Sequence, residues 1–251
     1  MTVQPGAEPF SAEGGPVGVL VLHGFTGSPR TVRPWAEHLA AAGLTVQAPR
    51  LPGHGTTWQD LAKTSSRDWY GAAEQAFTEL SGRCAQVFVA GISMGACLAF
   101  RLAETQGAKV SGVVAVNPSL AADTRLFLLA PVLKHVSLSV KGIAGDVKKP
   151  GASEGGYKRV PLTAAGTLPA LWKLTARQLA GVTQPVLVYR SAVDHVVGPH
   201  SMQALTRALP AATVVPLPDS YHVATLDNDA PAIFDGTLAF IKEHTAAEKR
   251  V

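Results

Sequence analysis

Cysteine and charge are both scarce in this sequence. Only 2 of the 251 residues are cysteine, Cys84 and Cys97, and so few cannot form a disulfide scaffold. Charged residues make up 16%, which together with 24 Gly and 18 Pro excludes a coiled coil, whereas the 47% hydrophobic content excludes disorder. No apolar run approaches the roughly 18 residues that a membrane-spanning helix needs. We therefore expect a globular protein with free thiols and no stable membrane insertion.

Targeting and cofactor signals are also missing. The opening stretch, MTVQPGAEPFSAEGG, has neither a basic n-region nor an apolar h-region, so we expect a cytoplasmic protein. The net charge is +4, but the basic residues are scattered and no basic stripe with interleaved aromatics predicts a nucleic-acid partner. CxxC, HExxH and glycine-rich phosphate-binding motifs are absent, and we expect neither a metal nor a cofactor.

Hydrophobic periodicity divides most of the chain into alternating strands and helices. The expected strands are mostly continuous apolar runs, which is typical of strands buried on both faces: Val17–Leu22, Leu44–Ala48, Gln86–Ala90, Gly112–Val116, Pro185–Tyr189 and Thr213–Leu217. Helical patterns lie between or after them: Thr31–Ala42, Arg67–Leu80, Met94–Gln106, Gly198–Leu209 and Pro231–His244. This alternation predicts an α/β fold, a mostly parallel sheet flanked by helices.

One stretch, residues 119–181, breaks the alternation. No strand is obvious in it, while Leu126–Leu133 is strongly apolar and Thr167–Leu179 is helix-like. A structureless loop of this length is improbable in a compact domain. We therefore expect a core of residues 1–118 and 182–251, with residues 119–181 inserted as a small helical cap over one end of the sheet.

The strongest chemical signal is the pentapeptide GISMG at 91–95. It follows an apolar strand run and opens a helical run, and this strand–turn–helix context is that of a nucleophile elbow. Glycines at positions 91 and 95 suit such an elbow, because strand and helix crowd the central serine. The alternative is a glycine-rich turn with a capping serine. The pattern predicts Ser93 as a nucleophile.

A serine hydroxyl needs a base that takes its proton. His222 lies just after the last expected strand, where doubly wound folds place functional loops. His54 is the main rival, but it precedes Ser93, whereas triads built on such an elbow follow the order serine, acid, histidine. We expect His222 to be the base, and an ordinary loop histidine is the alternative.

The acid of the triad should lie between these two residues and after another strand. Asp194 fulfils both conditions, because it follows the strand expected at Pro185–Tyr189. There it would hold the imidazole tautomer and stabilise the imidazolium. Asp219, which lies close before His222 in the sequence, is the alternative acid.

An acyl-transfer site also needs two backbone N–H donors for the developing oxyanion. The residue after the nucleophile, Met94, is expected to supply one. The other is expected from Phe25, in the loop HGFTG that follows the first long strand, where Gly24 would allow the backbone to turn. A plain turn with a core-packed Phe25 is the alternative.

These motifs occur in an order that resembles a known family. HGFTG at 23–27, LPGHG at 51–55, GISMG at 91–95, DHVV at 194–197 and SYHVATLD at 220–227 are similar to motifs of the bacterial monoacylglycerol lipase and carboxylesterase group of the α/β-hydrolase superfamily. The resemblance implies an α/β-hydrolase core with a small cap, no cofactor, and nucleophile, acid and base at Ser93, Asp194 and His222. It places the oxyanion donors on Phe25 and Met94. It differs at Ala96, where many relatives have a second glycine.

The resemblance also implies a polar cap residue that binds the glycerol hydroxyls, and Glu154 occupies the equivalent segment. A solvated role for Glu154 is the alternative. The apolar run that includes Leu126 and Leu129 is a natural wall for an acyl chain, or else ordinary cap packing. We thus expect a serine hydrolase that cleaves carboxylic esters of medium-chain acids, with a monoacylglycerol-like substrate, acting as a monomer or homodimer.

Two other readings stay open. The same triad could cleave an amide or a C–C bond, because the fold alone does not fix the reaction. A non-catalytic ligand-binding protein on a hydrolase scaffold is a less favoured possibility.

Overall fold

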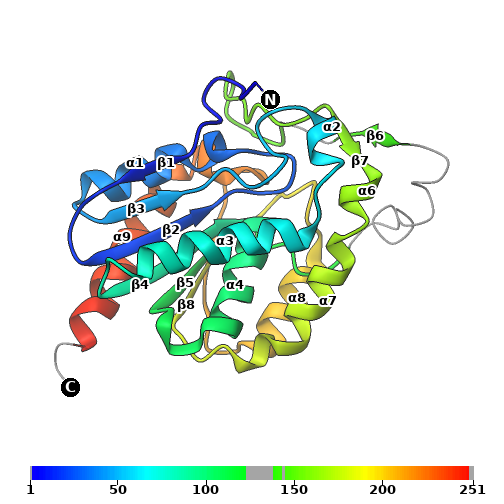
Figure 1. The fold of residues 1–251 in the computed structure, drawn as a ribbon. Helices are drawn as coiled ribbons and strands as arrows, with labels where there is room; N and C mark the ends of the chain where they lie inside the picture. The colour runs from blue at the N-terminus through cyan, green and yellow to red at the C-terminus, as the bar shows by residue number, and fades with distance from the viewer. Residues whose placement is uncertain (1, 123–137, 143–144, 249–251) are drawn as a thin grey trace.

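The computed structural model describes residues 2–122, 138–142 and 145–248. The chain forms one layered α/β structure in which helices cover both faces of a central sheet (Figure 1). Leu126 and Leu129, the expected acyl-chain wall, lie outside the described residues.

The central sheet has seven strands in the order β1-β3-β2-β4-β5-β8-β9. Six of them match the expected runs closely: β2 (Val17–Leu22), β3 (Thr45–Ala48), β4 (Gln86–Ile92), β5 (Gly112–Val116), β8 (Val186–Ser191) and β9 (Thr213–Leu217). These six pair in parallel, whereas the edge strand β1 (Phe10–Ala12) runs antiparallel to β3. The mostly parallel sheet expected from the sequence is confirmed, but β1 was missed because three residues carry no readable alternation.

Side chains from both faces of the sheet are buried. In β2, Leu20 and Leu22 belong to one hydrophobic cluster, while Val19 and Val21 belong to the cluster on the opposite face. Successive strand side chains point to opposite faces, so a strand covered on both sides is apolar at every position. This two-sided burial is why most strands appeared in the sequence as continuous apolar runs; the edge strand β9 is an exception, because Leu217 is its one buried residue.

Helices cover both faces of the sheet in the described part of the chain. Helices α1 (Arg33–Ala41) and α9 (Ala230–Glu248) lie on the Val19 side (Figure 1). On the Leu20 side lie α3 (Ser66–Ser81), α4 (Met94–Gln106), α7 (Leu168–Gln178) and α8 (Pro199–Ala208). Helix α3 begins with a capping box, in which the Ser65 and Asp68 side chains satisfy each other's backbone N–H groups. The helix ends agree with the expected ones to within a few residues, except that α9 runs on past the expected end at His244.

The stretch between β5 and β8 holds more than helices. A two-stranded antiparallel hairpin, β6 (Ser139–Lys141) with β7 (Arg159–Pro161), precedes α6 (Leu162–Ala165) and α7. The expectation that no strand lies in this stretch was therefore wrong, since strands of three residues leave no periodic pattern. The one-turn helix α2 (Trp58–Leu61) was missed for the same reason.

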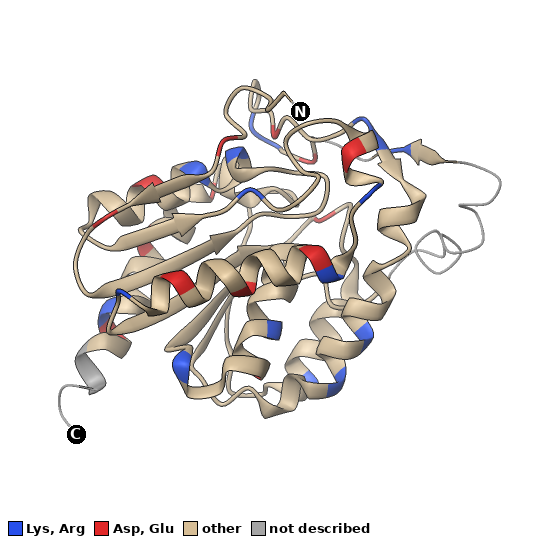
Figure 2. Ribbon diagram, viewed as in Figure 1, with Lys and Arg blue, Asp and Glu red and all other residues tan. Residues whose placement is uncertain are grey.

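Charged side chains are distributed over many elements. Figure 2 shows Lys and Arg as well as Asp and Glu on many of the helices and loops. Among the described residues, no helix combines the length and apolar character needed to cross a bilayer.

Candidate active site

Ser93 occupies a sharp turn between β4 and α4. Its backbone lies at φ 56° and ψ −117°, a region that non-glycine residues rarely adopt. The flanking glycines permit this turn, because a Cβ on Gly95 would lie 2.1 Å from the Leu22 carbonyl oxygen and a Cβ on Gly91 would lie 2.4 Å from Gly95. The turn places the Ser93 hydroxyl at the N-terminus of α4, where unpaired N–H groups carry partial positive charge.

The other expected triad residues follow neighbouring strands. Ser93 comes directly after β4, Asp194 follows β8, and His222 lies in the loop after β9. The carboxyl ends of parallel strands meet at one edge of the sheet, and functional loops of doubly wound folds gather there. The fold thus brings three residues that are far apart in sequence to the same edge.

Asp194 and His222 form a buried pair. His222 Nδ1 lies 3.0 Å from Asp194 Oδ2, and the two side chains are 8% and 0% exposed. The other oxygen, Oδ1, accepts hydrogen bonds from the backbone N–H groups of Val196 and Val197 at 2.9 and 2.8 Å. Burial raises the pKa of Asp194, but these hydrogen bonds and the His222 charge outweigh it, so the pKa lies below its ordinary value. The carboxylate is therefore held ionised against the imidazole.

Ser93 and His222 open into one cavity of about 330 Å³. Phe25, Met94 and Glu154 also line it, and the apolar part of the lining includes Leu168, Trp172 and Val197. A mainly apolar cavity with a few polar groups beside a serine and a histidine is typical of a site for a small, largely hydrocarbon ligand.

The expected oxyanion donors, Phe25 and Met94, line the same cavity as Ser93. Within the described residues, neither the Phe25 nor the Met94 backbone N–H donates to a protein acceptor, so both are available to a ligand in the cavity. The backbone turns at this loop, since the Gly24 carbonyl accepts the Gly27 N–H at 3.3 Å, but Gly24 itself does not have a positive φ. Its role is close approach, because a Cβ there would lie 3.3 Å from the Ser93 Cβ.

His54, the rival base, is buried away from the Asp194 carboxylate. Its ring packs against His23, Phe25 and Trp69, and its Nδ1 lies 3.0 Å from the Pro52 carbonyl oxygen. Desolvation by burial holds its pKa well below the usual histidine range. His54 therefore packs behind Phe25 as a neutral ring.

His23 supports the same loop. Its Nε2 accepts a hydrogen bond from the Leu51 backbone N–H at 3.1 Å, so Nδ1 carries the proton and donates to the Gly24 carbonyl at 2.9 Å. Burial lowers its pKa to about 4, and it too stays neutral at pH 7. The two histidines brace the backbone that presents the Phe25 N–H.

Asp219, the alternative acid, lies elsewhere. Its side chain is 56% exposed, and one carboxylate oxygen lies 2.5 Å from Lys148 Nζ. The structure places Asp194, and not Asp219, against His222.

Glu154 reaches the cavity from the stretch between β6 and β7. Its Oε1 accepts a hydrogen bond from the Gly145 backbone N–H at 2.5 Å. Burial raises its pKa, while the Gly145 hydrogen bond and the charge of His222 oppose the rise. Glu154 is thus a partly buried carboxyl group near His222, the expected base.

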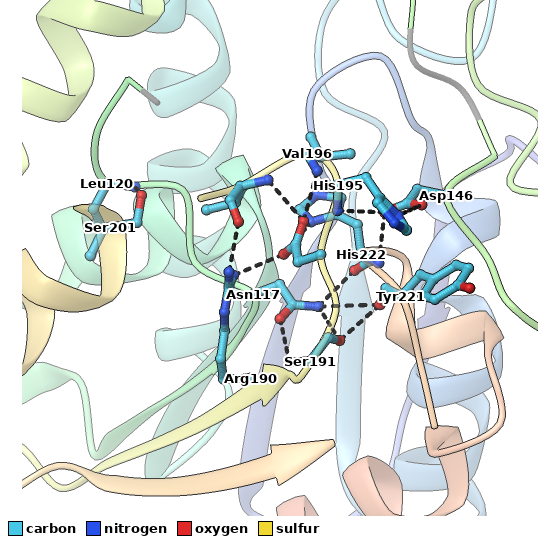
Figure 3. A network of polar contacts seen from close by, with 12 residues as sticks. Asn117, Leu120, Asp146, Arg190, Ser191, His195, Val196, Ser201, Tyr221 and His222 are labelled. Carbon is cyan, nitrogen blue, oxygen red and sulfur yellow. Dashed lines mark hydrogen bonds and ion pairs between the residues drawn. The ribbon is translucent and has the colours of Figure 1, made fainter. Parts of the chain in front are cut away.

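Asn117, which the sequence did not single out, joins the end of β8 to the loop that carries His222. It follows β5, is fully buried, and donates from Nδ2 to the His222 carbonyl at 2.8 Å and to Ser191 Oγ at 2.9 Å (Figure 3). Its Oδ1 accepts the Ser191 backbone N–H at 2.9 Å. A signal was present in the sequence, because Asn117 is a polar residue at the end of an apolar strand, as Asp194 nearly is.

Asp146 was also missed, and it connects the inserted stretch to both triad loops. Its carboxylate accepts from the His195 backbone N–H at 3.2 Å and the His222 backbone N–H at 3.1 Å, and contacts His195 Nδ1 at 2.7 Å (Figure 3). Its own carbonyl accepts the Val223 N–H at 3.0 Å. Asp146 lies in a glycine- and lysine-rich stretch without periodicity, so no sequence pattern identified it.

Asp227 also holds the loop that carries His222, through hydrogen bonds to backbone N–H groups. Its two carboxylate oxygens accept four backbone N–H groups at 2.7–2.9 Å: those of Lys148, Lys149, Tyr221 and Asn228. The carboxylate thereby ties the inserted stretch to the loop that carries His222. Within the described residues, no group of three or more His, Cys, Asp or Glu side chains could hold a metal ion.

Comparison with known proteins identifies the family of the chain. The model of the "Alpha/beta hydrolase family" matches residues 19–235. The chain belongs to the alpha/beta hydrolase family. The fold class and the resemblance expected from the sequence are therefore confirmed.

Individual relatives within the alpha/beta hydrolase family cover almost the whole chain. The "Thermostable monoacylglycerol lipase" of Bacillus sp. (strain H-257) is 39% identical over 96% of this chain and 97% of its own. The "Carboxylesterase" of Bacillus subtilis (strain 168) is 26% identical over 94% of this chain and 96% of its own.

A similar structure has been solved for a metagenome-derived lipolytic enzyme described with the pair LipS and LipT. It is 36% identical, with a TM-score of 0.93, and the match covers 97% of this chain and 100% of that one.

Proposed function

We propose that this protein is a serine hydrolase that cleaves carboxylic esters through an acyl-enzyme. The observation that carries the proposal is the placement of Ser93 at a strained turn, opening into the cavity that also holds the buried His222–Asp194 pair. The relatives named monoacylglycerol lipase and carboxylesterase support an ester as the substrate.

In the first half of the proposed reaction, Ser93 Oγ attacks the ester carbonyl carbon while His222 Nε2 takes the hydroxyl proton. Asp194 fixes the imidazole through Nδ1 and stabilises the imidazolium. The N–H groups of Phe25 and Met94 bind the oxyanion. When the tetrahedral intermediate collapses, the C–O bond to the alcohol breaks and His222 returns the proton to the departing oxygen.

In the second half, a water molecule replaces the alcohol. His222 removes a proton from this water, which attacks the acyl-Ser93 carbonyl and forms a second tetrahedral intermediate. Its collapse breaks the bond to Ser93 Oγ, and His222 protonates that oxygen. The carboxylic acid leaves and the enzyme regains its starting protonation state, so the cycle needs no cofactor.

We propose a monoacylglycerol of a medium-chain acid as the preferred ester. A cavity of about 330 Å³ suits one acyl chain better than two or three. Glu154 is one of the polar groups in the lining, and its carboxylate can accept hydrogen bonds from the glycerol hydroxyls. The 39% identical relative is named for the same activity.

We further propose that residues 119–181 act as the cap of the site and that residues 1–118 and 182–251 form the core. The cap would cover the Ser93 cavity through Glu154 and Asp146, while the inner face of α7, with Leu168 and Trp172, packs on the helical layer around α4. We also propose that the protein is a monomer or a homodimer. A cytoplasmic location is proposed as well, and the unpaired thiols of Cys84 and Cys97 support it.

A substrate panel tests this function. The panel contains nitrophenyl esters of increasing acyl length, monoacyl-, diacyl- and triacylglycerols, and a matched amide. The proposal predicts the highest kcat/KM for medium-chain monoacylglycerol, with di- and triacylglycerols poor. Preference for the amide, or turnover of none of the esters, would contradict it.

A further inference from the structure

Arg190 contacts the acid of the proposed triad. It lies near the end of β8, and its Nη1 donates to Asp194 Oδ2 at 2.8 Å. This is the oxygen that also faces His222 Nδ1 at 3.0 Å. Figure 3 shows Arg190 and His222 as parts of one polar network. A guanidinium and the imidazole therefore share one carboxylate oxygen.

The remaining hydrogen-bonding capacity of Asp194 is already used. Its Oδ1 accepts the N–H groups of Val196 and Val197, so neither the guanidinium nor the imidazole can turn to that oxygen. Arg190 Nη2 also donates to the Val197 carbonyl at 2.6 Å, which fixes the guanidinium in place. The Asp194 side chain is 0% exposed and that of Arg190 is 20% exposed, so water screens their interaction only in part.

This arrangement has an electrostatic consequence for the base. A triad carboxylate favours the protonated form of its histidine, because it faces the positive charge that forms on the ring. Arg190 offsets part of the carboxylate's charge and places its own positive charge within about 6 Å of His222 Nδ1. Both effects disfavour the imidazolium.

We propose that Arg190 is a positioning residue that lowers the proton affinity of His222 through their shared contact with Asp194, so that the base stays unprotonated at lower pH. The inference rests on the proposed function of Ser93, Asp194 and His222. It assigns Arg190 no contact with substrate.

Other charged or titratable side chains also surround Asp194 and His222, and the test must leave these side chains unchanged. From β8 and the loop after it come Arg190, Asp194 and His195, and from the inserted stretch come Lys141, Asp146 and Glu154. None of these others lies within hydrogen-bonding distance of Asp194 Oδ2 in the described structure. Arg190 is therefore the side chain to change.

The test is the pH profile of kcat/KM for Arg190→Gln, which removes the charge and keeps an N–H donor for the Val197 carbonyl. We expect the midpoint of the acidic limb to move to higher pH by about half a unit to one unit, because the imidazole then holds its proton longer. Arg190→Lys keeps the charge. We expect the midpoint of its acidic limb to equal that of the unmodified protein, even if the kcat/KM on its plateau is lower.

Arg83→Gln is the matched control. Arg83 precedes β4 and pairs with Glu13 at the opposite end of the sheet, so its removal changes the net charge equally without touching the triad. Its midpoint should not move. An unchanged midpoint in Arg190→Gln, or an equal shift in Arg190→Gln and Arg190→Lys, would overturn the proposal. If Arg190→Gln does not fold, Arg190→Met takes its place.

An NMR titration of the His222 ring separates this proposal from the proposed function. It needs no turnover, so it reports the proton affinity of His222 even if the esters in the panel are not hydrolysed. A higher midpoint in Arg190→Gln supports the electrostatic role of Arg190. The same midpoint in both proteins refutes it, whatever the activity measurements show.

Discussion

At the scale of single residues, we expect Glu154 to set the selectivity of the proposed enzyme for the alcohol part of its ester. Its carboxylate lines the cavity beside His222 and holds the Gly145 N–H, while burial raises its pKa. The carboxylate form can accept strong hydrogen bonds from the glycerol hydroxyls, which a simple alkyl or aryl ester lacks.

Glu154→Gln should therefore slow monoacylglycerol hydrolysis selectively. Loss of hydrogen bonds to a charged group predicts a fall of roughly 10- to 150-fold in kcat/KM for monoacylglycerol at pH 8. Short nitrophenyl esters, measured alongside, should be affected little. Glu37→Gln, a 54% exposed carboxylate on α1, is the control and should change neither rate. Equal slowing of both ester classes by Glu154→Gln would show that Glu154 has no role in alcohol selectivity.

Residue-scale prediction from sequence depended on chain order and strand ends. Ser93 carries a local motif, and Asp194 and His222 follow apolar strands, so each could be singled out without coordinates. Asp146 could not, because its three donor groups come from loops around His195 and His222, about 50 to 80 positions away in the chain. Arg190 leaves a faint signal, a charge at the end of an apolar strand.

At the scale of elements, the turn from β4 to α4 depends on glycines that admit close backbone contact. A Cβ on Gly95 would lie 2.1 Å from the Leu22 carbonyl oxygen, and a backbone group cannot give way as a flexible side chain can. The same turn holds Ser93 at φ 56°.

Gly95→Ala should accordingly destabilise the fold by about 3 kcal/mol or more, measured by urea unfolding. Gly71→Ala is the matched control. Gly71 lies within α3, and a Cβ there meets nothing within 4 Å, so alanine should stabilise the protein by about 0.5–1 kcal/mol. Similar free energies of unfolding for the two variants would refute the claim that close packing at this turn requires glycine.

The inserted stretch is coupled to the triad loops through Asp146. Replacing this carboxylate with an amide leaves one of its donors, from His195 or His222, facing an N–H₂ group. Asp146→Asn should therefore lower kcat/KM about tenfold for every ester in the panel.

Asp219→Asn tests the same idea at a residue that also contacts the inserted stretch, through Lys148, but lies in an exposed pair. It should leave the rate nearly unchanged. A larger loss in Asp219→Asn than in Asp146→Asn would reverse the assignment and return Asp219 to consideration as the triad acid.

Element-scale prediction succeeded where apolar runs were long, in the strands buried on both faces and also in the edge strand β9. The six parallel strands and the helices that flank them were predicted because each leaves several apolar positions in a row or at helical spacing. The short elements β1, α2, β6 and β7 are held by pairing and packing with distant parts of the chain, and three or four residues carry too little pattern to show it.

At the scale of the whole molecule, stability depends on buried ionisable groups far from the site. The Glu104 side chain on α4 is 1% exposed, and burial raises its pKa to about 7, although Arg101 opposes the rise. In the unfolded chain the ordinary glutamate pKa is 4.5. Folding therefore retains a proton on Glu104 between these values, and the stability present below pH 4.5 is lost progressively as the pH rises through about 7.

Glu104→Gln should remove this loss. Its free energy of unfolding should exceed that of the unmodified protein at pH 8 by up to about 3 kcal/mol, and the difference should shrink towards zero near pH 4.5. Urea unfolding at several pH values measures it, with the exposed Glu37→Gln as control. A difference that does not vary with pH would show that Glu104 is ionised throughout.

Covalent labelling tests whether Ser93 performs nucleophilic catalysis. The protein is treated with a fluorophosphonate, the modified residue is located by peptide mapping, and residual monoacylglycerol hydrolysis is followed in the same sample. We expect one adduct, on Ser93, that forms in proportion to the loss of activity. Ser93→Ala should form no adduct, and its kcat should fall by several orders of magnitude. An adduct on another residue accompanying the loss of activity, or undiminished hydrolysis by Ser93→Ala, would contradict it.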